Sequence, residues 1–391
     1  MENISVIVPI FRGRKYIDGM VAQLERCADK CKGRHTLELV LVNDDPGETV
    51  GSLFSEKIEI NVLETDVNRG IHRARVRGLE HCIGSYVLFL DQDDRIAPEY
   101  FMSQLAHLED GDAVVCKLLH EGRQFYDTRM PFEEVVTRDF ILSVRNPIIS
   151  PGQVLIRKQK IPAVWKDAKL KNNGADDWLL WLCMLAKNYK FALNPEILFE
   201  HVVEGNNESI NAIHMIASEQ EIYKVIASAG IYRTDDLAKL RGAVQAAAES
   251  HIRLLSKFQK MFFIYDDWMK QQEEGRYIYA HLKSMGVGRV AIYGDSYIGK
   301  RLYHSLQGHG VAVSYFIDRN AAYLKEEIPV YLPEKGLPAV DLIIISLVEA
   351  VETIREELAR LSEAGICSVT ELLTEMQSGG DEDETTGFWH G

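Results

Sequence analysis

Three aspartates stand together where an apolar segment ends, and they are the residues of this chain best suited to chemistry. Residues 86–90 are apolar or aromatic and predict a short buried strand, which Asp91, Asp93 and Asp94 follow. Ligands of open α/β sheets bind at the carboxyl ends of strands, and carboxylates suit a hard divalent cation that also holds phosphates. The pattern predicts a metal and diphosphate site. The alternative is a solvated turn or a cap for a helix beginning near Pro98.

A second acidic group follows another predicted strand. Apolar patterning predicts strands and one helix ahead of the first site, at residues 4–11 (strand), 15–31 (helix), 37–42 (strand) and 58–63 (strand). Asp44 and Asp45 come directly after the second of these strands. Two acidic groups at strand ends within one alternating β/α pattern predict a nucleotide-binding crevice.

Four motifs in this region occur in a characteristic order. They are Val8-Pro9-Ile10-Phe11, Val42-Asn43-Asp44-Asp45-Pro46-Gly47, Asn68-Arg69-Gly70 with Ala74-Arg75, and Gly84 to Asp94. Together they resemble the ordered motifs of family 2 glycosyltransferases with the GT-A fold, over residues 1–212. Four motifs in sequence are far more specific than any one of them.

The resemblance implies transfer of a sugar from a nucleoside diphosphate to an acceptor hydroxyl, with inversion at the anomeric carbon. It implies Mn²⁺ or Mg²⁺ on Asp91 and Asp93, where a cation would neutralise charge that develops on the leaving diphosphate. The residues expected to bind the nucleotide-sugar are Pro9, Phe11, Asp44, Asp45, Asn68, Gly70, Arg75, Asp91, Gln92 and Asp176. In this set Phe11 would lie against the base and Arg75 would meet the phosphates. The alternative for Arg75 is a water-facing position on a helix predicted over 71–81.

A further segment, Asn172 to Leu182, resembles the Glu-Asp-Trp element of the family. The resemblance implies that Asp177 is the catalytic base and that Asp176 takes the Glu position. An inverting displacement needs a base on the face opposite the leaving group, and a carboxylate can serve. The alternative is that one of the two aspartates caps the helix that follows.

One family feature is altered here. Many relatives carry an Arg and a His just before a Gly-Asn-Asn sequence, and those positions read Val202 and Glu204 in this chain. The sequence leaves open whether Glu204 binds the metal, whether His201 does so through a shifted register, or whether neither does.

Composition limits the partners. Lys and Arg total 44 against 58 Asp and Glu, a net charge of −14, which argues against nucleic acid and against a broad anionic-membrane surface. No apolar run approaches the roughly 18 residues of a spanning helix. The six cysteines are scattered, which is typical of reduced core thiols and a cytoplasmic protein. A peripheral contact with the inner membrane face and a homodimer remain alternatives.

A second α/β pattern begins at Gly286. The strand at 290–293 leads into a glycine loop at 294–301, and the pattern predicts a Rossmann-like unit. The loop lacks the middle glycine of GxGxxG, and Arg301 replaces the Ser or Thr of a P-loop. Asp318 is suitably placed for a ribose, yet a non-catalytic scaffold or small-ligand module is the safer interpretation.

The sequence thus predicts an α/β chain of four parts. They are a GT-A domain at 1–212, a helical linker at 213–285, a Rossmann-like domain at 286–375 and a disordered acidic tail at 376–391. The predicted function is a metal-dependent inverting glycosyltransferase that uses a UDP-sugar and a glycan or lipid-linked acceptor in bacterial surface polysaccharide synthesis. One alternative is a non-catalytic nucleotide-sugar sensor or scaffold that works through its C-terminal unit. Another is a nucleotidyltransferase, which would release pyrophosphate.

Overall fold

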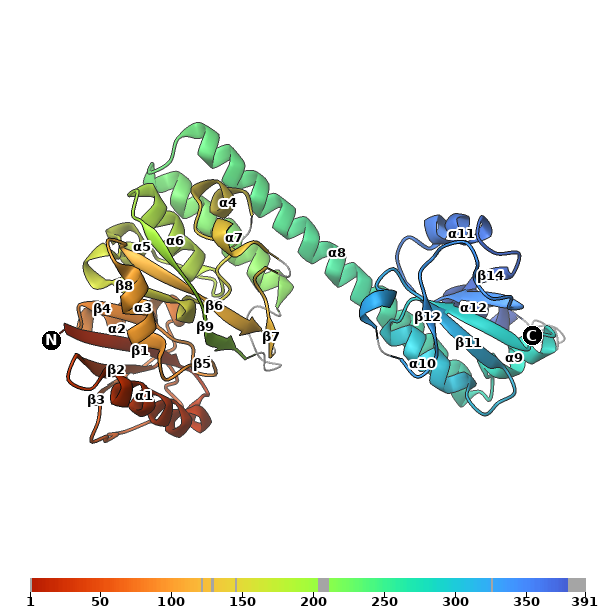
Figure 1. Ribbon diagram of the computed structural model, residues 1–391, viewed down its shortest axis with the longest axis horizontal. Coiled ribbons are helices and arrows are strands. Elements are labelled where there is room, and N and C mark those ends of the chain that lie inside the picture. Colours follow the sequence, from red (N-terminus) through yellow and green to blue (C-terminus); the bar gives the residue numbers. More distant parts are fainter. Residues whose placement is uncertain are drawn as a thin grey trace, which may run out of the picture. The chain divides into compact units, whose positions relative to one another are not determined.

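The computed structural model describes residues 2–120, 122–127, 130–144, 146–202, 211–324 and 326–378. The chain divides into two compact units between Ile252 and Arg253. Each unit has its own sheet, so the predicted α/β class with a second, C-terminal sheet unit is confirmed (Figure 1).

The first unit contains a nine-stranded mixed sheet. Its strands are β1 (Glu2–Ile10), β2 (His35–Asn43), β3 (Glu59–Glu64), β4 (Tyr86–Phe89), β5 (Arg95–Ile96), β6 (Ala113–His120), β7 (Arg123–Gln124), β8 (Val154–Arg157) and β9 (Phe191–His201). The order is β3-β2-β1-β4-β8-β6-β9-β5, and β7 pairs with β6. Strands β3, β2, β1 and β4 are parallel, whereas β8 runs antiparallel to both β4 and β6.

Helices follow or separate these strands. They are α1 (Ile17–Cys31), α2 (Ile71–His81), α3 (Tyr100–Leu108), α4 (Arg138–Ser143), α5 (Ala163–Asp167), α6 (Asp176–Ala186) and α7 (Ala212–Ala229), followed by α8 (Thr234–Glu273), which continues into the second unit. Short 3-10 helices lie at Arg14–Tyr16, Phe132–Glu134, Pro151–Gln153 and Lys158–Lys160. Helix α2 packs on β1 and β2, which fixes it beside the carboxyl ends of the parallel strands.

The central position of β1 explains its sequence. Its last seven residues are buried, because a parallel strand with neighbours on both sides and helices on its faces meets no water. Pro9 lies within this run. Proline has no backbone N–H, but no hydrogen bond between strands is lost at this position. The carbonyl of Ile7 accepts from Leu90 at the end of β4, so Pro9, two residues on, faces the side where β4 has already ended.

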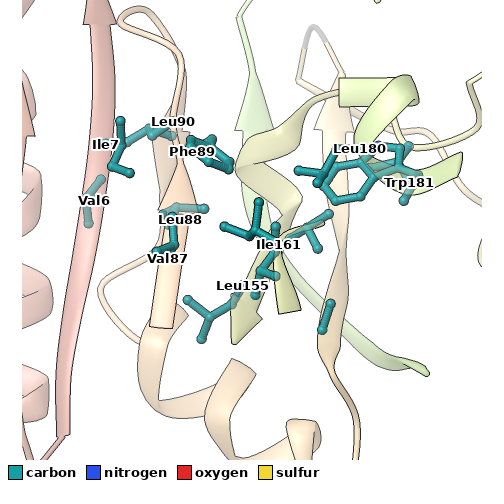
Figure 2. Close-up of a cluster of buried hydrophobic side chains, with 14 of the residues drawn as sticks. Val6, Ile7, Val87, Leu88, Phe89, Leu90, Leu155, Ile161, Leu180 and Trp181 are labelled. Carbon is teal, nitrogen blue, oxygen red and sulfur yellow. The ribbon is translucent and has the colours of Figure 1, made fainter. Parts of the chain in front are cut away.

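The core of the first unit lies between the sheet and its helices. Figure 2 shows apolar side chains of β1 (Val6, Ile7), of β4 (Val87, Leu88, Phe89), of β8 (Leu155) and of α6 (Leu180, Trp181). All eight are buried at 1% exposure or less, so α6 is anchored by its apolar side chains. Burial of each large side chain stabilises the fold by roughly 1.5–3 kcal/mol.

The second unit has five parallel strands. They are β10 (Arg289–Tyr293), β11 (Ala312–Ile317), β12 (Val330–Tyr331), β13 (Leu342–Ile345) and β14 (Gly365–Ser368), in the order β12-β11-β10-β13-β14. Its helices are α9 (Ile278–Ser284), α10 (Tyr297–Leu306), α11 (Val351–Ala359) and α12 (Val369–Ser378), with a 3-10 turn at Ala321–Tyr323. This strand order is that of a doubly wound nucleotide-binding sheet.

Two findings bear on the segments predicted at the edges of the domains. Helix α12 runs to Ser378, so the first three residues of the predicted tail 376–391 are helical, because Met376 is buried against the core of the second unit. Residues 379–391 lie outside the described residues. Across the described part of the chain, no helix combines the length and apolar character needed to cross a bilayer.

Candidate active site

The centre of the site is Arg75, a buried arginine on α2 that joins two acidic segments. Its Nη1 donates to both carboxylate oxygens of Asp176 at 2.8 Å, and its Nη2 donates to Oδ1 of Asp91 at 2.5 Å. The side chains of Arg75 and Asp176 are each 3% exposed, whereas that of Asp91 is 26% exposed. Burial alone would lower the pKa of Arg75, but the charges of Asp176 and Asp91 overcome this and raise it. The arginine therefore ties the loop after β4 to the start of α6.

The next residue of α6, Asp177, is a buried carboxylate with two hydrogen-bond donors. The side-chain amide of Asn146 donates to Oδ2 at 2.8 Å, and the backbone N–H of Trp178 donates to Oδ1 at 2.8 Å. Burial, and then the negative charge of Asp176, raise the pKa of Asp177 to about 7, with Arg75 acting in the opposite direction. This carboxylate can therefore change its protonation state near neutral pH.

Neither Asp176 nor Asp177 occupies the N-cap position of α6, so the helix-capping alternative is wrong. The N-cap of α6 is Ala175, which makes no side-chain cap, and the two aspartates are the first two helical residues. Likewise the helix after Pro98 has Glu99 as its N-cap, without a side-chain hydrogen bond, so the acidic loop after β4 does not cap it.

The loop after β4 contains aspartates in two different settings. Asp94 is buried, and it accepts from Ser150 Oγ at 2.9 Å and from the backbone of Val202 at 3.1 Å, while His201 Nδ1 lies 2.9 Å from its Oδ1. Burial raises the pKa of Asp94, and the hydrogen bond of His201 opposes that shift. Asp94 therefore connects this loop to β9 and to the segment before β8.

Asp93 stands apart from these bonds. Burial, and then the nearby charges of Asp94 and Asp91, raise the pKa of Asp93 to about 6. The contributions of Asp94 and Asp91 to this shift show that carboxylates lie close together after β4. A cation bound there would relieve the repulsion between them.

Asp44, one of the residues predicted to bind the nucleotide-sugar, closes the loop that precedes α2. Its carboxylate accepts from the backbone N–H groups of Arg69 at 3.0 Å and Gly70 at 2.8 Å, and from Thr65 Oγ1 at 3.2 Å. Gly70 has φ 84°, a conformation that glycine adopts without strain, and an added Cβ would lie 2.7 Å from Asn173 Oδ1. The loop before α2 thus lies against the loop before α6.

The other predicted residues near Asp44 also have local partners. Asn68 Oδ1 accepts from the N–H of Gly70 at 3.0 Å, and Asp45 Oδ1 accepts from the N–H of Gly47 at 2.9 Å. A groove of about 330 Å³ runs beside Asp44 along α2, and Arg69 and Arg73 are among its lining residues. Arg75, assigned to the phosphates from the sequence, does not line this groove, because its terminal nitrogens are held by two carboxylates.

Gln92 joins the loops that follow β1 and β4. Its Oε1 accepts from the N–H of Phe11 at 3.1 Å, and its Nε2 donates to the carbonyl of Phe11 at 3.3 Å. Phe11 keeps a ring that is 40% exposed and that lies under the guanidinium of Arg12 at 5.0 Å. Pro9 is buried in β1, so its side chain offers no exposed surface for a ligand. The backbone of the aromatic residue is therefore fixed while its ring remains accessible.

The sequence matches a model of one protein family. Residues 5–165 match Glycosyl transferase family 2. Over these residues, the sequence is similar to glycosyl transferase family 2. The match runs from β1 into α5 and includes Arg75, Asp91 and Asp93, whereas Asp176 and Asp177 lie beyond it.

Individual proteins are similar to the same part of the chain. The amylovoran biosynthesis glycosyltransferase AmsE of Erwinia amylovora is 24% identical over 237 residues, which cover 56% of this chain and 84% of that protein. The putative teichuronic acid biosynthesis glycosyltransferase TuaG of Bacillus subtilis is 25% identical over 217 residues, 53% of this chain and 82% of that protein. Among solved structures, S. aureus TarS 1–349 in complex with UDP has 20% identity and a TM-score of 0.44, covering 62% of this chain and 70% of that one.

Asp91 and Asp93 are the residues predicted to hold a divalent cation. Within the described ranges, no three His, Cys, Asp or Glu side chains form a group that could hold a metal ion by themselves. Asp91 and Asp93 nevertheless fit a cation, because Mg²⁺ and similar ions commonly use one or two carboxylates and take further ligands from substrate phosphates. His201 has its Nδ1 on Asp94. Glu204, the other residue considered for the metal, lies outside the described residues.

Three contacts of the transferase domain were missed by the sequence interpretation. Asn146 on Asp177, Ser150 on Asp94 and the pairing of Arg75 with Asp176 each join segments far apart in the chain. No periodicity or short motif marks Asn146 or Ser150. For Arg75 and Asp176 a signal did exist, since each was singled out separately, but their contact is a property of the fold.

Proposed function

We propose that this protein transfers a sugar from a nucleoside-diphosphate sugar to an acceptor hydroxyl with inversion, and that Asp177 is the base. The observation that carries the proposal is the setting of Asp177: a buried carboxylate with a pKa raised to about 7, at the first turn of α6, connected through Asp176 and Arg75 to the acidic loop after β4. A base with a pKa near the working pH transfers protons most effectively.

The two hydrogen bonds to Asp177 support this role. Asn146 and the N–H of Trp178 each hold one oxygen of the carboxylate, and this restricts its orientation toward an acceptor. In the transfer, the acceptor oxygen forms the new bond to the anomeric carbon as the bond to the diphosphate breaks. Asp177 takes the hydroxyl proton, and the electron pair of the broken bond leaves with the nucleoside diphosphate.

We assign the donor to the carboxyl ends of β1, β2 and β4. The exposed ring of Phe11 offers a surface for the base, and Asp44 and Asp45 lie beside it at the end of β2. Arg69 and Arg73 line the adjoining groove and are the guanidinium groups that we place nearest to donor phosphates. Arg75 is then a positioning residue, since it acts through Asp91 and Asp176.

Asp91 and Asp93 would hold Mn²⁺ or Mg²⁺ here, and the ion would stabilise the charge of the departing diphosphate. The support for this is that Asp94 and Asp91 lie close to Asp93, where burial and then their charges raise the pKa of Asp93 to about 6. The most exposed member of the Arg75 cluster is Asp91, so one ligand lies where a donor can reach it.

We further propose surface polysaccharide assembly as the context, with a UDP-sugar as the first donor to test and a glycan or lipid-linked sugar as the acceptor. The support is that similar proteins are named for amylovoran and teichuronic acid biosynthesis.

The test is donor turnover by the purified full chain. UDP-, GDP- and dTDP-sugars are supplied with and without Mn²⁺, first with water as acceptor and then with a polyprenyl-diphosphate monosaccharide. We expect release of one nucleoside diphosphate, dependent on Mn²⁺ and lost in Asp93→Asn. Asp167→Asn serves as the matched control, because Asp167 is an exposed aspartate at the end of α5.

Two results would reject the proposal. Equal turnover in Asp93→Asn and in the wild type would remove the acidic loop from the reaction. Release of pyrophosphate in place of nucleoside diphosphate would identify a nucleotidyltransferase instead.

A further inference from the structure

A short segment between α4 and β8 contacts both acidic parts of the site. It consists of residues 146–150, here called the bridging segment. At its start, the side-chain amide of Asn146 donates to Oδ2 of Asp177 at 2.8 Å. At its end, Ser150 Oγ donates to Oδ2 of Asp94 at 2.9 Å. The bridging segment therefore connects the start of α6 to the loop after β4.

The second half of the bridging segment is held by a buried glutamine. Because these residues belong to no helix or strand, their backbone N–H groups need partners other than a helical or ladder carbonyl. Gln153 Oε1 accepts from the N–H of Ile149 at 2.9 Å and from that of Ser150 at 3.3 Å. Gln153 is 0% exposed, so bulk water does not compete for these bonds.

The first half of the bridging segment is held by Tyr126, which follows β7 and is also 0% exposed. Gln153 Nε2 donates to the phenol oxygen at 3.0 Å, and that oxygen lies 3.0 Å from the carbonyl oxygen of Pro147. A hydroxyl has one hydrogen to donate, and the Pro147 carbonyl is nearer than Gln153 Oε1 at 3.4 Å. Tyr126 therefore donates to Pro147, the residue that directly follows Asn146.

We propose that Tyr126 is a positioning residue for sugar transfer, whose hydroxyl keeps Asn146 against Asp177 by holding Pro147. The inference rests on the proposed function, in which Asp177 is the base. Tyr126 is buried, so it acts through the chain and not on the reacting atoms. Without its hydroxyl, the Pro147 carbonyl loses a donor and the amide of Asn146 is less restrained. The carboxylate of Asp177 then has a wider range of orientations, which slows a transfer that depends on geometry.

The alternative is that Tyr126 only fills the core. Its ring packs against Phe125 and Phe132, with ring centroids 5.3 Å and 5.1 Å apart. Tyr126→Phe keeps the ring and removes only the hydroxyl. A core role requires the ring, whereas the positioning role requires the hydroxyl, so this substitution separates the two.

The test compares release of nucleoside diphosphate by the wild type and by Tyr126→Phe, with the UDP-, GDP- or dTDP-sugar that the wild type turns over. Water and a polyprenyl-diphosphate monosaccharide serve as acceptors. We expect kcat to fall by about 3- to 10-fold, less than the roughly hundredfold cost of a 1 Å displacement, because one restraint is weakened and no reacting group is removed. KM for the donor should change by less than about twofold, because the donor site is not altered.

Tyr315→Phe is the matched control. Tyr315 is 1% exposed in the second unit, and its hydroxyl also donates to a proline carbonyl, that of Pro338, at 2.6 Å. This variant loses the same kind of bond but should keep the kcat of the wild type. An equal loss of rate in Tyr315→Phe would overturn the proposal.

A double-mutant cycle tests whether Tyr126 acts through Asn146. In Asn146→Ala no amide is left to be positioned, so adding Tyr126→Phe should lower kcat by less than about twofold further. Tyr126→Phe alone should also move the pH–rate profile to higher pH, because a weaker bond from Asn146 raises the pKa of Asp177. A core role would leave the profile in place. Full additivity of the two substitutions would show that Tyr126 does not act through Asn146.

Thermal unfolding of each variant controls for lost stability, and the rates are measured below the lowest unfolding midpoint. Wild-type kcat and an unmoved pH profile in Tyr126→Phe would remove the role of Tyr126. If Asp177→Asn abolishes transfer in the same assay, the proposed function survives that result. Turnover in Asp177→Asn comparable to that of the wild type would instead reject the proposed function itself.

Discussion

The two units of this protein share a strand order but differ in what stands at the strand ends. Both contain a parallel 3-2-1-4 arrangement, β3-β2-β1-β4 in the first unit and β12-β11-β10-β13 in the second. After the fourth strand the first unit has Asp91, Asp93 and Asp94, whereas the second has Ser346 and one exposed acid, Glu349. The same topology therefore carries a cluster of carboxylates in one unit and a hydroxyl with a single exposed carboxylate in the other.

The partners of these groups differ as well. Ser346 Oγ lies 3.0 Å from the carbonyl oxygen of Tyr293 and 2.9 Å from that of Gly294, so it ties two strand ends together. Asp318, the carboxylate after the second strand of that unit, accepts from the backbone of Asp295 and Asn320. The two units therefore share a strand order, but only the first has several carboxylates after the fourth strand, and function depends on such side chains and not on the fold alone.

The strongest way to break this comparison is to remove the proposed base, Asp177, from the first unit. Asp177→Asn should lower transfer by about 10²- to 10⁴-fold, because the amide cannot accept the acceptor proton. Donor binding, followed by calorimetry, should remain. The matched change in the second unit, Asp318→Asn, should leave transfer intact. Comparable turnover in Asp177→Asn would remove that residue as the base.

The next effect concerns stability. Arg75→Met should destabilise the first unit by about 3–5 kcal/mol, because Asp176 is left charged and buried without its partner. Urea unfolding followed by tryptophan fluorescence measures this. Arg73→Met is the control, and a change above about 0.5 kcal/mol there would indicate a general effect of losing an arginine from α2.

The raised pKa of Asp177 predicts a pH dependence of both rate and stability. Its folded pKa of about 7 exceeds the ordinary value of 3.8, so its contribution to stability is complete below about pH 4 and is lost as pH rises through 7. Between pH 5 and 8 the wild type should therefore lose about 2–3 kcal/mol relative to Asp177→Asn. Transfer should instead rise with pH and level off above about 7. A stability difference that does not vary with pH would contradict the burial of this charge.

A smaller change should shift the pKa of the proposed base, Asp177, without removing its carboxylate. Asn146→Ala deletes one donor to the Asp177 carboxylate and should raise its pKa further. The pH–rate profile is expected to move upward by roughly half to one pH unit, with a fewfold lower rate at neutral pH. A merely structural role for Asn146 would lower the rate at all pH values without moving the profile.

The smallest expected effect concerns the second unit, where Ser346 stands after the fourth strand. Ser346→Ala should destabilise the second unit by about 1 kcal/mol, because hydrogen bonds between two strand ends are lost. Thermal unfolding of that unit measures the change. Release of nucleoside diphosphate should not change, and a large loss of turnover would show that the second unit takes part in the reaction.

Local patterns predicted the first four strands of the first unit, but not β5 to β9. The helix expected over 71–81 coincides with α2, and the first three strands lie where their apolar runs stand. These elements are encoded by periods of 3.6 and 2 residues and by continuous buried runs, which short windows of sequence contain.

The site was only partly predictable, because its contacts join distant segments. Arg75 and Asp176 are 101 residues apart, and Asp94 and His201 are 107 apart, so no local spacing relates them. The order of the motifs predicted that Arg75 binds phosphate. Its burial between Asp91 and Asp176 instead depends on how α2 packs against α6, which no motif shows. The pairing of Asn146 with Asp177 is of the same kind, since a loop residue gains its role from the packing around it.

The salt-bridged trio formed by residues 75, 91 and 176 has an evolutionary consequence. Loss of Arg75 leaves the buried carboxylate of Asp176 without its cation, and loss of Asp176 leaves the buried arginine only the partly exposed Asp91, so a single exchange at either position is costly while a compensated change is not. In related sequences positions 75 and 176 should therefore covary, even though they belong to two helices that are far apart in the chain.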